Sequence, residues 1–144
     1  MQEILIRKLH EYISENNPDL LLTLQEENKV TEFLNSTVSS VDGLINELLQ
    51  ENKPTSLIEE LCINELTKTL RPSRFNYLKS ILEEEFPSDF KKLLQSGLLK
   101  TEVINMIAVC DPVFDELGFS IEKEDDRYLR YAVTGAMHEY FKKD

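Results

Sequence analysis

Apolar residues recur every three or four positions along almost the whole chain, and this spacing is the strongest constraint on its fold. The longest unbroken stripe consists of Val30, Phe33, Leu34, Val38, Val41, Leu44, Ile45, Leu48 and Leu49. Such a period is that of an amphipathic α-helix. Only 4 glycines and 5 prolines occur among 144 residues, too few for the many tight turns of an all-β fold. The sequence therefore predicts an all-α protein.

The stripes and the residues that interrupt them indicate six to seven helices. They are expected at about residues 2–16, 26–52, 56–70, 73–86, 87–97, 101–118 and 125–142. The apolar residues 19–24 fit either a helical turn or a buried extended segment. Poor helix formers fill much of 35–43, so we expect a kink or a break near Asp42-Gly43, which gives two helices in place of one.

Several helix ends carry sequence signals. Ser56 and Glu59 have the spacing of a capping box, in which each side chain accepts a hydrogen bond from a free backbone N–H of the first turn. Thr101 is expected to cap the helix that it begins, and Gly97 to end the one before it, in which Phe90, Leu93 and Leu94 are expected to pack inward. Pro112 is expected to bend or restart the helix in which it lies.

The length of the chain fits one domain, and neither an internal repeat nor a flexible linker divides it. We therefore expect residues 1–144 to form a single compact helical bundle. In its last helix, Gly135 is expected to let another helix approach closely. Lys142 and Lys143 at the end of that helix complement the negative end of the helix dipole.

Charge is segregated along the chain, whose net charge is −11. Residues 68–100 hold seven basic and four acidic residues, a net of +3, whereas residues 1–67 carry −9 and residues 101–144 carry −5. Charge distribution influences the choice of partner more than the fold. The basic stretch is therefore the best indication of what the protein meets.

Within this stretch, Arg71 and Arg74 flank Pro72-Ser73 at the expected start of a helix, with Ser73 as its N-cap. Free N–H groups and the helix dipole attract anions to such a place. We predict an anion-binding or partner-binding corner that consists of Lys68, Arg71, Ser73 and Arg74. The alternative is that both arginines pair with some of the chain's own 27 acidic residues.

No residue pattern indicates catalysis, a metal or a cofactor. His10 and His138 lack the spacing of metal ligands. Cys62 and Cys110 lie on apolar stripes and are expected to pack as small hydrophobic side chains, with Asp111 raising the pKa of Cys110. The carboxylates of Glu83–Glu85 and similar runs point in different directions on a helix, so they do not form a catalytic pair. We expect no enzyme.

Nothing in the sequence indicates a membrane span or a secretory signal peptide. A cytoplasmic protein without membrane partners is therefore expected. The two helices around residues 56–86 resemble a helix-turn-helix in outline, but their turn lacks a glycine, and Glu83–Glu85 would repel a phosphate backbone.

Six short motifs, in this order, resemble a small family of helical proteins of unknown function from Bacteroides-type bacteria, associated with conjugative transposons and other mobile elements. The motifs are Asn17-Pro18-Asp19-Leu20, Glu59-Glu60-Leu61, Leu70-Arg71-Pro72-Ser73, Glu84-Glu85-Phe86, Cys110-Asp111-Pro112-Val113-Phe114 and Thr134-Gly135. The chain departs from the family where alanine-rich second and third helices, and a histidine at Pro72, would be expected. The resemblance implies an all-helical fold in a bacterial cytoplasm, and no activity.

These patterns favour a non-enzymatic helical module that binds another protein, or a second copy of itself, within a mobile-element or regulatory system. The alternative is a protein that associates with nucleic acid through the basic face of residues 68–100, or whose acidic faces mimic DNA. The overall negative charge makes nucleic acid the less favoured partner.

Overall fold

The computed structural model of the protein describes residues 1–142, which contain nine α-helices, two 3-10 helices and no strand. The predicted all-α class is confirmed, with more helices than the six to seven expected. The chain divides into two compact units, which we call unit 1 (residues 1–71) and unit 2 (from Pro72 onward). No helix of the described part is long and apolar enough to cross a bilayer.

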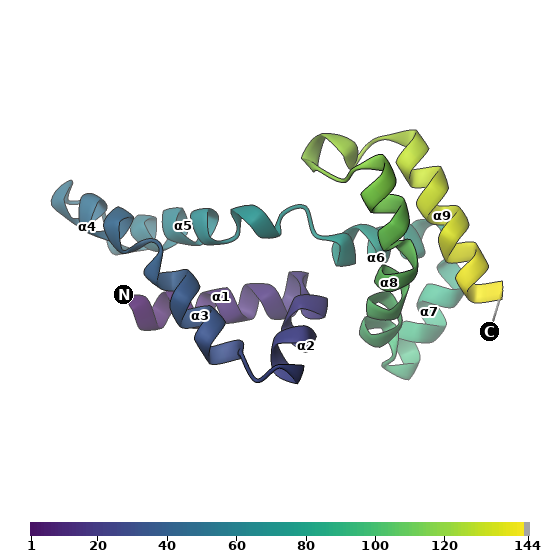
Figure 1. The fold of residues 1–144 in the computed structure, drawn as a ribbon, viewed down its shortest axis with the longest axis horizontal. Coiled ribbons are helices and arrows are strands. Elements are labelled where there is room, and N and C mark those ends of the chain that lie inside the picture. The colour runs from purple at the N-terminus through teal and green to yellow at the C-terminus, as the bar shows by residue number, and fades with distance from the viewer. Residues whose placement is uncertain (143–144) are drawn as a thin grey trace. The chain divides into compact units, whose positions relative to one another are not determined.

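Unit 1 comprises five α-helices and one 3-10 helix (Figure 1). Their bounds are α1 Gln2–Asn16, α2 Pro18–Glu26, α3 Val30–Ser39, α4 Asp42–Gln50, α5 Thr55–Leu66 and η1 Lys68–Leu70. Helix α1 packs against α2, α3 and α5, and α4 packs against α5. Every third or fourth residue of α1 (Leu5, Leu9, Ile13) is buried in the core of this unit, which also includes Leu34, Val38, Ile58 and Cys62.

Both additional helices are in unit 1. Residues 18–26 form helix α2, with Pro18 in its first turn, where a missing N–H costs nothing. The expected helix over 26–52 begins only at Val30, because Asn28 turns the chain with a φ of 57°. That helix then breaks at Ser40-Val41 into α3 and α4, so the expected break is confirmed.

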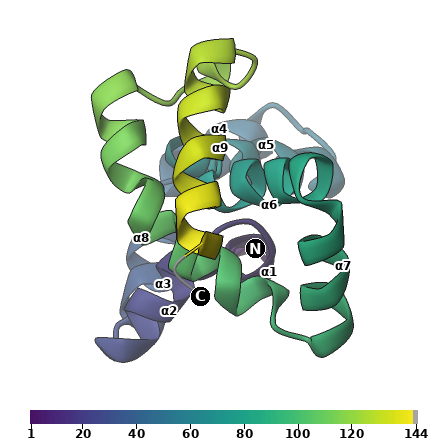
Figure 2. The same ribbon diagram turned by 90° about the vertical axis from the view of Figure 1, so that its right-hand side faces the viewer.

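Unit 2 comprises four α-helices and one 3-10 helix (Figure 2). Their bounds are α6 Arg74–Glu85, α7 Pro87–Ser96, α8 Leu99–Leu117, η2 Ile121–Lys123 and α9 Arg127–Lys142. Helix α8 packs against α6, α7 and α9, and α6 also packs against α7 and α9. The core of this unit includes Leu78, Leu82, Val103, Met106, Phe114, Leu129, Val133 and Met137.

The sequence predicts one domain, whereas the structure has two hydrophobic cores, one within each unit. The boundary falls between Arg71 and Pro72, in a short polar turn like those between other helices of the chain. Apolar spacing reports that a helix has a buried face, but it does not report which other helices cover that face.

The expected helix ends are partly correct. Gly97 (φ 76°) and Gly118 (φ 83°) end α7 and α8, as expected. The capping box is wrong, because α5 begins at Thr55 and no side chain caps it. Thr101 is also not a cap, because α8 begins two residues earlier, at Leu99. Helix α8 runs through Pro112 without restarting, at an exposed position where water can satisfy the carbonyl that the proline leaves unbonded.

Within the described residues, no helix makes the close approach expected at Gly135. A Cβ placed on Gly135 would meet no heavy atom within 4 Å, so no residue of the described part uses the space that the glycine leaves. At the end of the same helix, Lys142 lies in the last turn of α9 as expected. Lys143 lies outside the described residues.

Candidate functional site

Arg71 lies in unit 1, at the end of the segment that follows α5. Its Nε donates to the carbonyl oxygen of Thr67 at 3.4 Å, and its Nη2 donates to that of Asn64 at 3.0 Å. These carbonyls lie at the C-terminal end of α5, where a positive charge opposes the negative end of the helix dipole. Arg71 therefore stabilises the end of α5.

Ser73 and Arg74 lie in unit 2, at the start of α6. The Ser73 hydroxyl accepts a hydrogen bond from the backbone N–H of Asn76 at 3.0 Å, so its predicted role as N-cap is confirmed. One of the free N–H groups on which an anion site would depend is thereby occupied.

Arg74 reaches from α6 to α8. Its Nη1 lies 2.7 Å from Asp111 Oδ1 and its Nη2 lies 3.2 Å from Asp115 Oδ1. The guanidinium carbon also lies 4.9 Å from the centre of the Phe114 ring, a cation–π distance. Burial lowers the pKa of Arg74, but the hydrogen bonds to the two carboxylates outweigh it, and the pKa is raised overall.

Both guanidinium groups of the predicted anion-binding corner are thus engaged within the chain. Arg74 pairs with carboxylates, which is the alternative that the sequence allows, whereas Arg71 binds backbone carbonyls. The remaining member, Lys68, is an exposed residue of η1 in unit 1. The four residues are divided between two units, and Arg71, Ser73 and Arg74 have separate local roles.

Arg74→Ala is expected to lower the free energy of unfolding of unit 2 by about 1–2 kcal/mol. Two half-exposed ion pairs and one cation–π contact are lost together, each worth at most about 1 kcal/mol. Native-state hydrogen exchange of residues 74–117 measures the change. Arg71→Ala is the matched control, since it removes an arginine from unit 1 and leaves this protection unchanged. Equal protection in Arg74→Ala and wild type would contradict the assigned role.

The acidic run that interrupts the basic stretch also has a partner. Arg130 Nη2 of α9 lies 2.6 Å from Glu84 Oε2 and 3.2 Å from Glu85 Oε1 of α6. The hydrogen bonds to the two glutamates outweigh the effect of burial, which lowers the pKa of Arg130, and raise it overall. These acids are therefore partly neutralised. Arg130 was not identified from sequence, because its partners lie more than forty residues away.

Unlike the two arginines, three lysines later in the basic stretch have no ion-pair partner among the described residues. Lys91, Lys92 and Lys100 are exposed, and none forms an ion pair with another described residue. Between Phe86 and Thr101 the only acidic residue is Asp89, so this segment carries a net charge of +2. The turn from α7 to α8 therefore carries a local positive surface.

Two leucines lie exposed at the same turn. Leu94 is 58% exposed and Leu98 is 50% exposed, although Leu94 was expected to pack inward with Phe90 and Leu93. Leu93 and Phe90 do pack against the core. We call the surface formed by Lys91, Lys92, Leu94, Leu98 and Lys100 the α7–α8 corner.

The geometry of the turn explains this exposure. Gly97 adopts a left-handed conformation, its N–H donates to Leu94 O at 3.3 Å, and the N–H of Leu98 donates to Leu93 O at 3.0 Å. This is the hydrogen-bond pattern of a Schellman motif, which ends α7 sharply and reverses the chain into α8. The turn joins the end of α7 to the start of α8 at one end of unit 2 (Figure 2).

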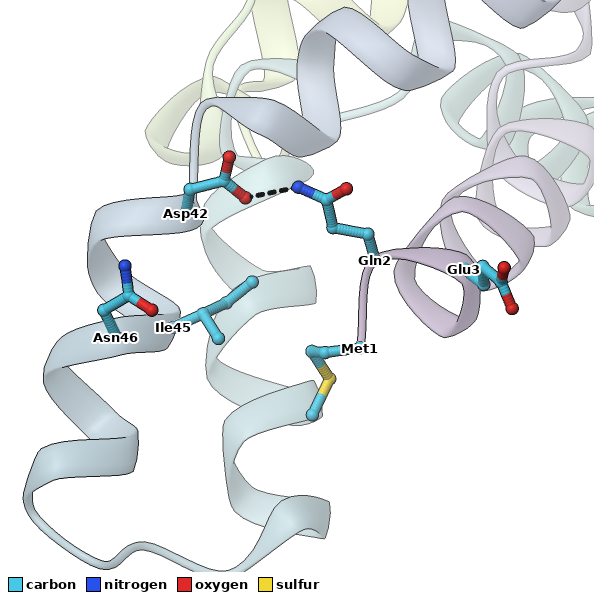
Figure 3. A pocket seen from close by; sticks show the side chains of 6 residues that line it. All are labelled: Met1, Gln2, Glu3, Asp42, Ile45 and Asn46. Atoms are coloured by element: carbon cyan, nitrogen blue, oxygen red, sulfur yellow. Dashed lines mark hydrogen bonds between the residues drawn. The ribbon is translucent and has the colours of Figure 1, made fainter.

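An open pocket lies in unit 1 at the starts of α1 and α4 (Figure 3). It is lined by Met1, Gln2, Glu3, Asp42, Ile45 and Asn46. Gln2 Nε2 donates to Asp42 Oδ1 at 2.6 Å, while the Glu3 side chain points away from this pair. The lining side chains include no cysteine, serine or histidine.

Cys62 and Cys110 are both fully buried, and the prediction that they pack as small hydrophobic side chains is confirmed. Burial raises the pKa of the Cys62 thiol. Burial and, to a lesser degree, Asp111 raise the pKa of Cys110 to about 12, as the sequence indicated for Asp111. Within residues 1–142, no group of three or more His, Cys, Asp or Glu side chains is placed to hold a metal ion.

Comparison with known proteins gives no match: no family model, no curated protein and no solved structure is similar to this chain. The resemblance to the mobile-element family remains a prediction.

Proposed function

We propose that this chain is a non-enzymatic helical module that binds a protein partner through the α7–α8 corner. The observation that carries the proposal is the pair of half-exposed leucines, Leu94 and Leu98, beside three lysines without ion pairs among the described residues. Exposed apolar side chains that gather at one place, ringed by polar groups, mark protein interaction sites more often than single scattered ones do.

The corner indicates the chemistry of the partner. Lys91 and Leu94 are three residues apart on α7 and lie on one side of that helix, and Leu98 follows at the turn that ends it, so a positive charge and two exposed apolar side chains belong to the same corner. An acidic segment with apolar side chains of its own complements this surface, because the leucines supply affinity and the lysines guide encounter. The remaining charge of the chain, which is strongly acidic, would repel such a partner from other surfaces.

A nucleic acid complements this surface less well. Leucine side chains gain little from a phosphate backbone, and both arginines of the basic stretch already have partners within the chain. The cytoplasm of a bacterium, and a mobile-element or regulatory system within it, is the setting that we propose with this function. It rests on the sequence resemblance alone.

The test is photo-crosslinking in the cell that encodes the protein, with a photoreactive phenylalanine in place of Leu94. We expect discrete adducts with an acidic protein, and at least a tenfold loss of them when Lys91→Glu and Lys92→Glu are added, because charge reversal opposes encounter. The matched control carries the same photoreactive residue in place of Leu49, which is exposed to a similar degree on α4 of unit 1.

Two results would contradict the proposal. Equal adducts from positions 94 and 49 would show that the corner is not selective. The second result is that the purified protein binds duplex DNA. If that binding weakens steeply with salt, depends on Lys91 and Lys92 and is unchanged by Leu94→Ser, it supports the nucleic-acid alternative instead.

A further inference from the structure

Helix α9 has a second exposed surface in unit 2, independent of the α7–α8 corner. Its buried face consists of Leu129, Val133 and Met137. On the opposite face Tyr128, Tyr131, Gly135 and His138 follow one another at intervals of three and four residues, and all four are exposed. Tyr128 is 79% exposed and Tyr131 is 70% exposed, the two highest values among the large hydrophobic side chains of the described part. We call this face the tyrosine face; α9 is the helix in the foreground of Figure 2.

We propose that the tyrosine face binds the same face of a second copy, with the two α9 helices antiparallel about a two-fold axis at the level of Val133. In that register, a residue that lies a given number of positions before Val133 is level with the partner's residue that lies the same number of positions after Val133. Tyr131 and Gly135, near the middle of the face, then lie against the partner's Gly135 and the partner's Tyr131, while Tyr128 and the partner's His138 lie at the same level on the two edges of the interface. An interface that uses one patch on both copies closes on itself and stops at the dimer.

The space beside Gly135 supports this pairing. A Cβ on Gly135 would meet nothing within 4 Å, so the glycine leaves a shallow gap in the exposed face of α9. Glycine in a helix interior lowers its stability relative to alanine, so a reason for it is expected from close approach of another group. No side chain among residues 1–142 fills the gap, which leaves room for an aromatic ring of a second copy.

Charges at the two ends of the face match in the same register. Arg127 at the start of α9 lies at the same end of the interface as the partner's Glu139, and the symmetry repeats this combination of charges at the other end. Neither residue forms an ion pair with another described residue of its own chain, and both are exposed. A parallel arrangement would instead place arginine against arginine and glutamate against glutamate. Charge complementarity therefore favours the antiparallel dimer.

The size of the face sets the strength of the dimer. Two tyrosines from each copy bury roughly 600 Å² between them when most of each ring is covered, which is below the area of a standard stable interface. A weak dimer is expected, one that dissociates on dilution.

Sedimentation equilibrium of the purified full-length chain over a range of concentrations tests the proposal. The wild type is expected to pass from monomer to dimer as concentration rises. Tyr131→Ala should weaken the dimer at least tenfold. Gly135→Leu should weaken it to a similar extent while the helix itself becomes more stable, so that a loss of the dimer is not explained by unfolding. Leu94→Ser with Leu98→Ser is the matched control: it removes exposed apolar side chains from the α7–α8 corner and leaves dimerisation unchanged.

A charge exchange tests the register. Arg127→Glu and Glu139→Arg are each expected to weaken self-association, and an equimolar mixture of the two variants should dimerise like the wild type, because opposite charges then face each other at both ends. A wild type that stays monomeric at the highest concentrations, a dimer that survives Tyr131→Ala, or a mixture that does not recover would each overturn the proposal. Loss of the dimer in the Leu94→Ser, Leu98→Ser control would overturn the proposal as well, because the α7–α8 corner would then be the dimer interface.

Discussion

Phe114→Ala is expected to lower the free energy of unfolding of unit 2 by about 4 kcal/mol. Phe114 is 1% exposed, and its ring centre lies 4.8 Å from that of Phe119 and 5.8 Å from that of Tyr77. Truncation leaves a cavity among these rings and also removes the surface over which the Arg74 guanidinium lies. The loss therefore adds a cavity cost to the loss of apolar burial.

Native-state hydrogen exchange is the suitable measurement, because it reports protection segment by segment in the full chain. Protection should fall in residues 74–142 and stay unchanged in residues 2–66, since Phe114 belongs to the core of unit 2 alone. The matched control is Val109→Ala on the same helix, at an exposed position, with an expected change below about 0.5 kcal/mol. An equal loss of protection in both units would show that they unfold together, against the expectation from two separate cores.

The fold class follows from the sequence because helical spacing is local. The stripe Leu5, Leu9 and Ile13 needs only the neighbouring turns of the chain to be recognised, and all three residues are buried in α1. The number of helices was harder to predict from the sequence. Asn28 and Asn52 end α2 and α4 in a left-handed conformation, which asparagine adopts less readily than glycine, so the sequence signal there is weak.

The candidate sites depend on contacts between helices, which the spacing of residues along the chain does not reveal. Arg74 binds Asp111 and Asp115, which are close to it only because α6 packs against α8. Leu94 was expected to be buried because it lies beside Leu93 on a short helix, yet the face turned to the core is already occupied by Leu93 and Phe90. The tyrosine face did have a local signal, since Tyr128 and Tyr131 fall on the polar side of an amphipathic helix.

Above about pH 9, the stability of unit 2 is expected to fall because of Cys110. Its pKa is raised from 9.0 to about 12, first by burial and then by the charge of Asp111. The folded state therefore keeps a proton that the unfolded state releases, and the folded state loses stability as the pH rises. The contribution of the thiol is fully present below pH 9.0 and disappears progressively towards about pH 12. Each pH unit within this window costs about 1.4 kcal/mol, or about 3 kcal/mol by pH 11.

Urea unfolding of the full chain at several values from about pH 8 to about pH 11 measures this slope, with Cys110→Ala as the test variant. That variant is less stable at neutral pH because it leaves a small cavity, but its free energy of unfolding should decline less steeply than that of the wild type as the pH rises. Cys62→Ala in unit 1 is the matched control for unit 2: burial raises the pKa of that thiol too, but the variant leaves Cys110 in place, so the alkaline loss of unit 2 should stay that of the wild type. If the wild type and Cys110→Ala lost stability in parallel, other groups would account for the alkaline loss, and Cys110 would ionise without cost to the fold.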